Sequence, residues 1–179
     1  MICLTNWKQL FGGGLNLDKL KKNGLIVGSE FHAQQGVIID PGHCWLIKIG
    51  NHVTLAPNVH ILAHDASTKI AIGYTKIGRV SIGNNVFVGA STVILPNVKI
   101  GDNVVIGAGS IVTHDLPSNG VYYGNPCVKI MDYEQWCQKQ KRKMEKTIIY
   151  DKSYIIGNIT MEKKEQMKSE LADSIGFII

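Results

Sequence analysis

Residues 82–117 read IGNNVFVGASTVILPNVKIGDNVVIGAGSIVTHDLP, six consecutive units of six residues that each begin with Ile or Val. Three similar units, IGNHVTLAPNVHILAHDA, occupy residues 49–66. Gly follows the leading aliphatic residue in five of these nine units. A period of six matches neither an amphipathic helix nor the alternation of an ordinary strand, whereas a short fixed period is typical of a repeat architecture.

The repeat predicts an all-β fold, a parallel β-helix. Each unit supplies a short flat strand with an aliphatic side chain pointing inward, and three units of six close one turn of 18 residues. Successive turns stack at the spacing of neighbouring strands, about 4.8 Å. Asn, Asp and Gly dominate the positions between strands, where tight corners favour a left-handed backbone.

The repeat fails within residues 61–83, ILAHDASTKIAIGYTKIGRVSIG. Aliphatic residues would be due at positions 67, 73 and 79, which hold Ser, Gly and Arg. We therefore expect the chain to leave the wall near His64, to make an excursion over about 65–81, and to rejoin the wall near Val80. Loops on a rigid scaffold commonly carry binding and catalytic residues. If the excursion amounts to one turn plus three residues, Asn85 lies beside His64 on the next turn.

Outside the wall, the sequence predicts a lead segment and a C-terminal extension. Residues 1–26 form the lead, with a short helical stretch at LDKLKKNG, and residues 27–131 form the β-helix, in which PGHCWL (41–46) is a corner insertion. Residues 132–179 are expected to be a helical extension: one helix through YEQWCQKQKRKMEK, an extended stretch TIIYDKSYII, and a second helix at TMEKKEQMKSELAD.

Composition narrows the class of protein. The 179 residues carry a net charge of +5, and no apolar segment reaches the length that crosses a membrane. We expect a soluble cytoplasmic protein without a signal peptide or membrane insertion. None of the four cysteines forms a CxxC pair, which favours reduced thiols over disulfides or metal ligands. The basic run KQKRKMEK (139–146) lacks interleaved aromatic residues, so we interpret it as a solvated helix face rather than a nucleic-acid site.

The stretch IGNNVFVGASTVILPNVKIGDNVVIGAGSIVTHDLPSNGVYYGNPCVKI resembles the C-terminal half of the hexapeptide-repeat acyltransferases, especially the maltose, galactoside and capsule-sugar O-acetyltransferases. The repeat, the excursion, IGAGSIVTxDLP and the closing GNPxxxI occur in the family's order, and the resemblance covers about residues 39–131. It implies a left-handed β-helix and a homotrimer with active sites between subunits. It also implies direct transfer of an acetyl group from acetyl-CoA to a hydroxyl of a sugar or polysaccharide precursor.

The resemblance also assigns residues. The family's catalytic histidine maps onto His64, with His60 as the main competitor. A neutral imidazole can remove the proton of an attacking sugar hydroxyl, and a backbone N–H can stabilise the developing oxyanion. Asp40 matches an acidic residue that binds the acceptor, and we expect Asn85 and Tyr74 to contact the acceptor too. His32, His43 and His52 are interpreted as structural or exposed, and no metal site is expected.

For the coenzyme, the family uses a groove between coils near the last turns. Small residues there let the pantetheine arm approach the backbone, and basic residues contact phosphates. His114 and Met131 stand where relatives carry basic residues. The matching positions are Ala90, Ala108, Thr113, His114 and Lys129.

Several alternatives remain open from the sequence. An acetyltransferase acting on streptogramin-type drugs would share the excursion, and an N-acetyltransferase acting on amino sugars is a further alternative. A zinc carbonic anhydrase of the same fold needs three imidazoles around the metal, and His60 and His64 would need a third from another coil. A non-catalytic β-helix scaffold is the remaining alternative.

Overall fold

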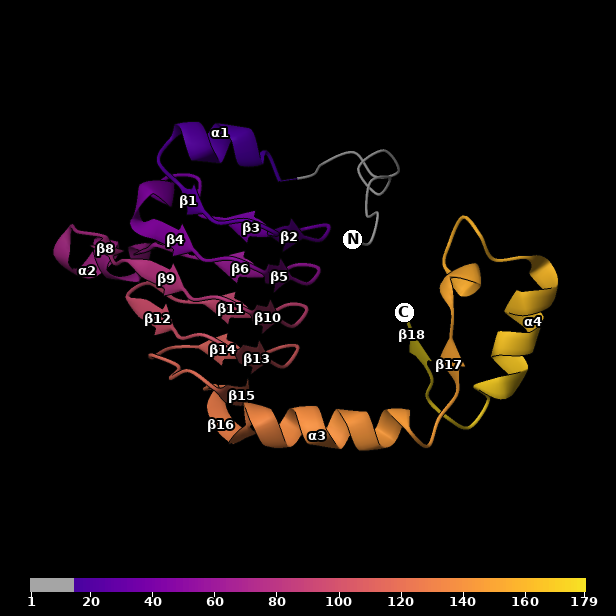
Figure 1. Cartoon of the computed structure of the whole chain (residues 1–179). Helices are drawn as coiled ribbons and strands as arrows, with labels where there is room; N and C mark the ends of the chain where they lie inside the picture. Colours follow the sequence, from indigo (N-terminus) through magenta and orange to yellow (C-terminus); the bar gives the residue numbers. More distant parts are fainter. Residues whose placement is uncertain (1–14) are drawn as a thin grey trace. The chain divides into compact units, whose positions relative to one another are not determined.

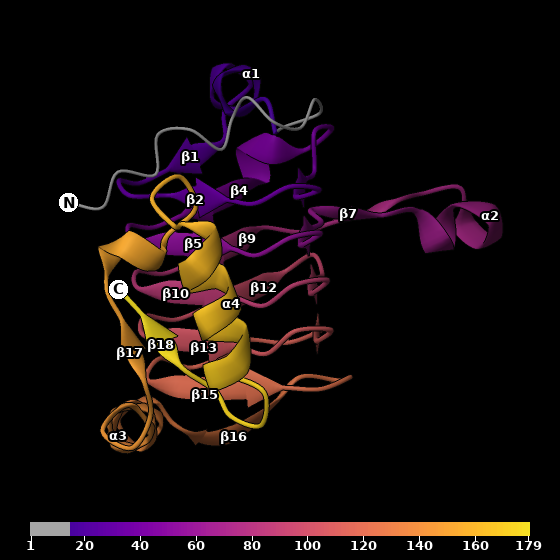
Figure 2. The same cartoon turned by 90° about the vertical axis from the view of Figure 1, so that its right-hand side faces the viewer.

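The computed structural model describes residues 15–179, which form two compact units divided between Tyr133 and Glu134. The first unit is a stack of short parallel strands in three sheets, which the first two figures show from two directions (Figures 1 and 2). Within the described residues, no helix is long and apolar enough to cross a membrane.

Each sheet gathers one strand from every coil, so strands adjacent in a sheet are distant in the sequence. The first sheet has the order β1-β4-β9-β12, with bounds Ile26–Val27, Ile47–Ile49, Val80–Ile82 and Val98–Ile100. The second has the order β16-β15-β13-β10-β5-β2, with bounds Val128–Asp132, Gly120–Tyr123, Val104–Ile106, Val86–Val88, Val53–Leu55 and His32–Ala33. The third has the order β14-β11-β6-β3, with bounds Ile111–Val112, Val93–Ile94, His60–Ile61 and Ile38–Ile39.

The pairing is that of a parallel β-helix. The chain visits the three sheets in turn, and every pair within them is parallel except the closing pair β15–β16. Val86 pairs with Val104 and Val93 with Ile111, so the coils after the excursion repeat every 18 residues, as predicted. The hand of the coil remains a prediction.

The leading aliphatic residues of the repeat form the core. All nine are buried: Ile49, Leu55, Ile61, Ile82, Val88, Ile94, Ile100, Ile106 and Val112. The small or aliphatic residue at the fifth position is buried as well, as at Val53, Val59, Thr92 and Val104. This confirms the predicted core.

Replacing Ile94 by Ala should lower the free energy of unfolding by about 2–5 kcal/mol, because it leaves a cavity between coils that cannot collapse. Ile94 is fully buried and lies between Ile61 and Val112 in its sheet. Ile26→Ala is the matched control, since Ile26 is exposed and should change stability by about 0.5 kcal/mol or less. Denaturant unfolding measures both, and equal losses would contradict a core made of these positions.

Asparagines at one corner form a ladder between coils. Asn85, Asn103 and Asn119 all have a left-handed backbone, with φ of 55°, 53° and 60°. The Asn85 amide donates to the Asn103 side-chain oxygen at 3.1 Å, and Asn103 donates likewise to Asn119 at 2.9 Å. These contacts satisfy the polar groups of the corner.

A short helix and a 3₁₀ turn precede and interrupt the early coils. Helix α1 (Leu17–Lys22) begins where the Asn16 side chain accepts a hydrogen bond from the Lys19 N–H, which matches the predicted helical lead. Residues 1–14 of the predicted lead segment lie outside the described residues. The PGHCWL insertion folds into the 3₁₀ helix η2 (Cys44–Leu46).

The excursion is a hairpin whose two strands pair with each other. Strands β7 (His64–Asp65) and β8 (Lys76–Ile77) pair antiparallel, and the 3₁₀ helix η3 (Ala66–Thr68) and helix α2 (Lys69–Ile72) form its end. Figure 2 shows this hairpin projecting from the stacked coils. Asp65 and Lys76 form an ion pair at 2.6 Å, and the Lys76 ammonium holds the pKa of Asp65 well below its ordinary value.

The hairpin adds more residues to its turn of the β-helix than the sequence predicted. Val53 pairs with Val86, 33 residues later, so this turn holds 15 residues more than the regular 18. The expected excess of three residues is therefore wrong. The wall does resume at Val80, where it was predicted to.

The second unit contains most of α3 (Tyr133–Met144) and all of α4 (Met161–Glu170), with β17 (Ile149–Tyr150) paired parallel to β18 (Phe177–Ile178). Both helices lie where the sequence predicts them. The predicted extended stretch is short, because the Asp151 side chain accepts from the Ser153 N–H and starts the 3₁₀ helix η4 (Lys152–Tyr154).

Candidate active site

The edge of the third sheet, where the excursion begins, brings two predicted site residues together. Ile39 pairs with Ile61 on neighbouring strands, and the Asp40 N–H continues the ladder by donating to the Ile61 carbonyl at 2.9 Å. Asp40 and His64 therefore leave the same edge of the sheet from successive coils, although 24 residues separate them.

Asp40 is fully buried and hydrogen-bonded on both oxygens. Its Oδ1 accepts from the backbone N–H groups of Gly42 and His43 at 3.0 and 3.2 Å. Its Oδ2 accepts from the Ala63 N–H at 3.0 Å and lies 2.5 Å from Nδ1 of His64. The side chain has no exposed surface in this chain, and its side-chain partner is His64; the expected contact between Asp40 and the acceptor stays a prediction.

The carboxylate fixes which nitrogen of His64 can accept a proton. Burial alone would raise the pKa of Asp40, but hydrogen bonds from His64 and from the backbone of Ala63 and Gly42 outweigh it and lower the pKa. An ionised carboxylate only accepts, so the neutral imidazole carries its proton on Nδ1. Nε2 is then the free basic nitrogen, on a side chain that is 40% exposed. This arrangement suits a general base.

A second imidazole lies beside this pair and was not predicted as a site residue. The His43 ring centroid lies 5.0 Å from that of His64 and 5.3 Å from that of Trp45. Its Nδ1 is buried, has no hydrogen-bond partner within residues 15–179, and lies 3.9 Å from Asp40 Oδ2. The only signal in the sequence was the corner insertion that carries His43 directly after Asp40.

Asn85 does not lie beside His64 in one chain. The hairpin shifts the register, so the Asn85 N–H donates to the carbonyl of Asn51 on the preceding coil. The Asn85 side chain belongs to the asparagine ladder, at a corner that leads into the second sheet. The predicted placement of Asn85 against the base is therefore wrong, because it assumed an excursion of three extra residues.

Tyr74 lies at the outer part of the hairpin and is 76% exposed. Its carbonyl accepts a hydrogen bond from the Thr68 hydroxyl at 2.7 Å, which closes the end of the hairpin. Its expected contact with the acceptor stays a prediction. His60, the competing candidate for the base, lies on β6 between Ile38 and Val93 and is outside the Asp40–His43–His64 group.

The predicted coenzyme residues lie on the last coils but at different corners. Ala90 and Ala108 follow β10 and β13, and the Ala90 carbonyl accepts from the Gly109 N–H at 2.8 Å. Gly89 packs so closely on this column that an added Cβ would lie 2.4 Å from the Ala108 nitrogen. This tight contact explains a run of small residues at that position.

The other three predicted coenzyme residues are polar and exposed. The side chains of Thr113 and His114 lie 3.1 Å apart after β14. Lys129, on β16, forms an ion pair with Asp132 at 2.6 Å, and this hydrogen bond raises the pKa of Lys129. Their contacts with coenzyme stay a prediction.

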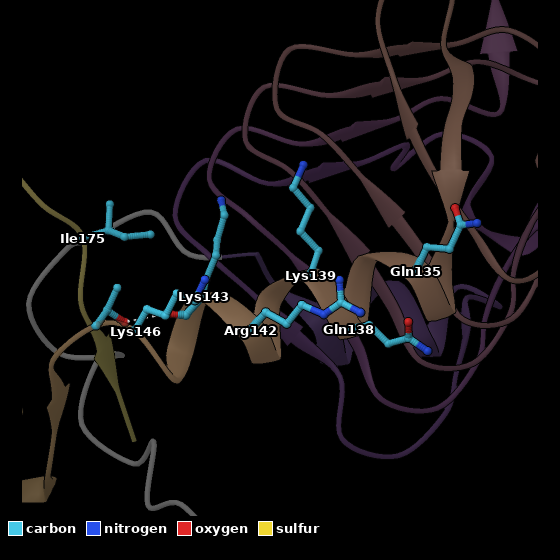
Figure 3. A pocket seen from close by; sticks show the side chains of 8 residues that line it. Gln135, Gln138, Lys139, Arg142, Lys143, Lys146 and Ile175 are labelled. Atoms are coloured by element: carbon cyan, nitrogen blue, oxygen red, sulfur yellow. Dashed lines mark hydrogen bonds between the residues drawn. The ribbon is translucent and has the colours of Figure 1, made fainter.

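The second unit has a groove of its own, about 640 Å³ in volume. Figure 3 shows Lys139 and Lys143 extending from the same side of α3. The groove contains none of the predicted site residues. It is lined by Gln135, Gln138, Lys139, Arg142, Lys143, Lys146, Thr147 and Ile175.

Comparison with known proteins identifies the family. Residues 79–114 match the family described as bacterial transferase hexapeptide (six repeats). Protein CapG of Staphylococcus aureus is 42% identical over 136 residues, which are 72% of this chain and 77% of that protein. The chain belongs to the bacterial hexapeptide transferases. The predicted family is thereby confirmed.

Solved structures of similar proteins agree with this membership. A maltose O-acetyltransferase from Clostridium difficile 630 is 35% identical with a TM-score of 0.52, over 65% of this hexapeptide transferase and 73% of that chain. A galactoside acetyltransferase in complex with coenzyme A is 32% identical with a TM-score of 0.51. The match covers 66% of this chain and 70% of that chain. Several curated acetyltransferases are matched over only about half of their own length. These relatives confirm the predicted enzyme class, the acetyltransferases.

Proposed function

We propose that this hexapeptide transferase moves an acetyl group from acetyl-CoA to a hydroxyl of a sugar or polysaccharide precursor, with His64 as general base. The observation that carries the proposal is the 2.5 Å contact between Asp40 Oδ2 and His64 Nδ1, at the edge where the repeat is interrupted. The similarity to a maltose O-acetyltransferase and to a galactoside acetyltransferase bound to coenzyme A supports the acceptor class and the donor.

In the proposed reaction, Nε2 of His64 takes the proton of the acceptor hydroxyl as its oxygen attacks the thioester carbonyl. The carbonyl becomes a tetrahedral oxyanion, which a backbone N–H can stabilise. The C–S bond then breaks, the acetyl ester remains on the acceptor, and the departing thiolate of coenzyme A takes up a proton. Asp40 stabilises the imidazolium that forms, and no covalent enzyme intermediate is needed.

The proposed coenzyme contacts lie on the late coils of a left-handed β-helix: Ala90 and Ala108 at one corner, Thr113 and His114 at another, and Lys129 on β16. The support is the small side chains of Ala90 and Ala108, which would let a thin pantetheine arm approach the backbone of the closely stacked coils. Lys129 would exchange its contact with Asp132 for a phosphate of the coenzyme.

A homotrimer with active sites between subunits is also part of the proposal. Its support is the excursion hairpin, which exposes several apolar side chains that water solvates poorly. Ile70 is fully exposed, and Ile72, Tyr74 and Ile77 are mostly exposed. A neighbouring subunit would cover such a patch and place Tyr74 near its acceptor.

The experiment is a transfer assay in which a thiol reagent detects release of coenzyme A, run over a panel of sugars and one amino sugar. We expect release that depends on a sugar hydroxyl, together with acetyl-CoA binding by calorimetry and a trimeric mass by light scattering. Transfer to the amino group alone would replace O-acetylation by N-acetylation. Absence of acetyl-CoA binding would reject the enzyme in favour of a scaffold.

A further inference from the structure

Three side chains at the candidate active site converge in a way that general-base chemistry does not require. The donor atoms of Asp40, His43 and His64 lie within 4.8 Å of one another. General-base chemistry uses only the Asp40–His64 pair. The His43 Nδ1 is the one buried side-chain polar atom among residues 15–179 that lacks a hydrogen-bond partner, and it faces the same carboxylate oxygen at 3.9 Å.

The separations are close to those of a metal site. Zinc binds imidazole nitrogen at about 2.0–2.1 Å and carboxylate oxygen at about 2.0–2.2 Å, so tetrahedral ligand atoms lie about 3.3 Å apart. From Asp40 Oδ2, Nδ1 of His64 is at 2.5 Å and Nδ1 of His43 is at 3.9 Å, and these two values bracket that separation. A sub-ångström shift of the imidazoles would equalise them.

The surroundings favour a transition metal over magnesium or calcium. Two imidazoles and one carboxylate form a nitrogen-rich set, whereas magnesium and calcium prefer oxygen ligands. Three backbone N–H groups hold Asp40 in place, which supplies the outer contacts that orient a metal ligand. The side chains of His43 and His64 are 31% and 40% exposed, so the three residues lie close to the protein surface.

We propose that Asp40, His43 and His64 bind a divalent transition metal ion, with zinc as the preferred ion, and that the ion switches the transferase off. A metal on Nδ1 of a neutral imidazole displaces the proton from that atom and leaves Nε2 protonated. The Nε2 lone pair that would accept the hydroxyl proton is then lost. The inhibition rests on the proposed role of His64, whereas the binding of the metal does not.

Metal binding is tested directly with Co²⁺, whose visible absorption reports tetrahedral coordination. The wild-type protein should bind one Co²⁺ per chain, and Zn²⁺ should displace it. His43→Gln should weaken binding by more than about 100-fold, because even the outer contacts of metal ligands are worth about 10–100-fold. His60→Gln is the matched control, on the coil that carries His64, and it should bind Co²⁺ like the wild type. Zn²⁺ should also raise the Tm of the wild-type protein, a readout that needs no variant.

Activity separates the two parts of the proposal. Zn²⁺ should inhibit wild-type transfer, a chelator should restore it, and His43→Gln should stay active in the same Zn²⁺ concentration. Unchanged Co²⁺ affinity in His43→Gln, or no Co²⁺ binding and no Tm shift in the wild type, would overturn the metal site. If the protein binds the metal in this way but shows no transferase activity, the proposed function is overturned and the metal site is not.

Discussion

Replacing His64 by Ala should reduce acetyl transfer by about 10²- to 10⁴-fold, the range that a positioned general base contributes. The substitution removes the nitrogen that accepts the hydroxyl proton. It should leave the affinity for acetyl-CoA unchanged, because the proposed coenzyme residues lie on later coils. Initial rates of thiol release, with calorimetric binding of acetyl-CoA, measure the two effects separately.

His60→Ala is the matched control for this variant. His60 lies on the same coil, four residues earlier, but its ring is outside the group around Asp40. We expect it to retain transfer close to wild type. Wild-type rates in His64→Ala, or an equal loss in both variants, would remove His64 from the role of base.

The fold was predictable because every coil needs the same types of residue at the same positions. Each long wall strand buries two side chains two positions apart, the fifth residue of one unit and the leading aliphatic residue of the next, so the inward positions recur every six residues and all nine leading ones are buried. Corners with a left-handed backbone favour Asn or Gly, as Asn85 and Asn103 illustrate. Because this requirement recurs in nine units, a single sequence is enough to show the period of six residues.

The length of the excursion was not predictable in the same way. Its hairpin is held by local contacts, the Asp65–Lys76 ion pair and the Thr68 hydrogen bond to the Tyr74 carbonyl, and neither has a period. Its isoleucines at 70, 72 and 77 resemble wall residues but are exposed. The register across the break, and with it the position of Asn85, therefore follows only from the strand pairing.

The candidate site was partly predictable. His64 was singled out because the repeat stops beside it, and Asp40 was singled out as a contact of the acceptor, without its hydrogen bond to His64. This hydrogen bond depends on the pairing of β3 with β6, which brings residues 24 positions apart into contact. His43 sits in an insertion, where no repeat constrains the side chain, so its place beside the pair could come only from the structure.

Asp40→Asn should lower kcat by about 10²- to 10⁴-fold, by analogy with the carboxylate of a Ser-His-Asp triad. An amide at this position can donate to Nδ1 of His64 and so favour the tautomer that carries its proton on Nε2, which cannot accept a proton. It also withdraws the negative charge that stabilises the imidazolium. Because the Asp40 side chain has no exposed surface and the proposed coenzyme residues lie on later coils, the KM for acetyl-CoA should change little.

The variant also removes hydrogen bonds that hold the coil edge, so stability must be measured beside activity. Asp40 accepts from the backbone of Gly42, His43 and Ala63, and an amide keeps only one acceptor oxygen. We expect a loss of about 1–3 kcal/mol in the free energy of unfolding, the cost of leaving a buried donor unpaired. A folded Asp40→Asn protein with wild-type kcat would show that the carboxylate does not set the tautomer of His64. A fall in kcat without a change in KM, in a protein that still unfolds cooperatively, would establish Asp40 as the residue that positions the base.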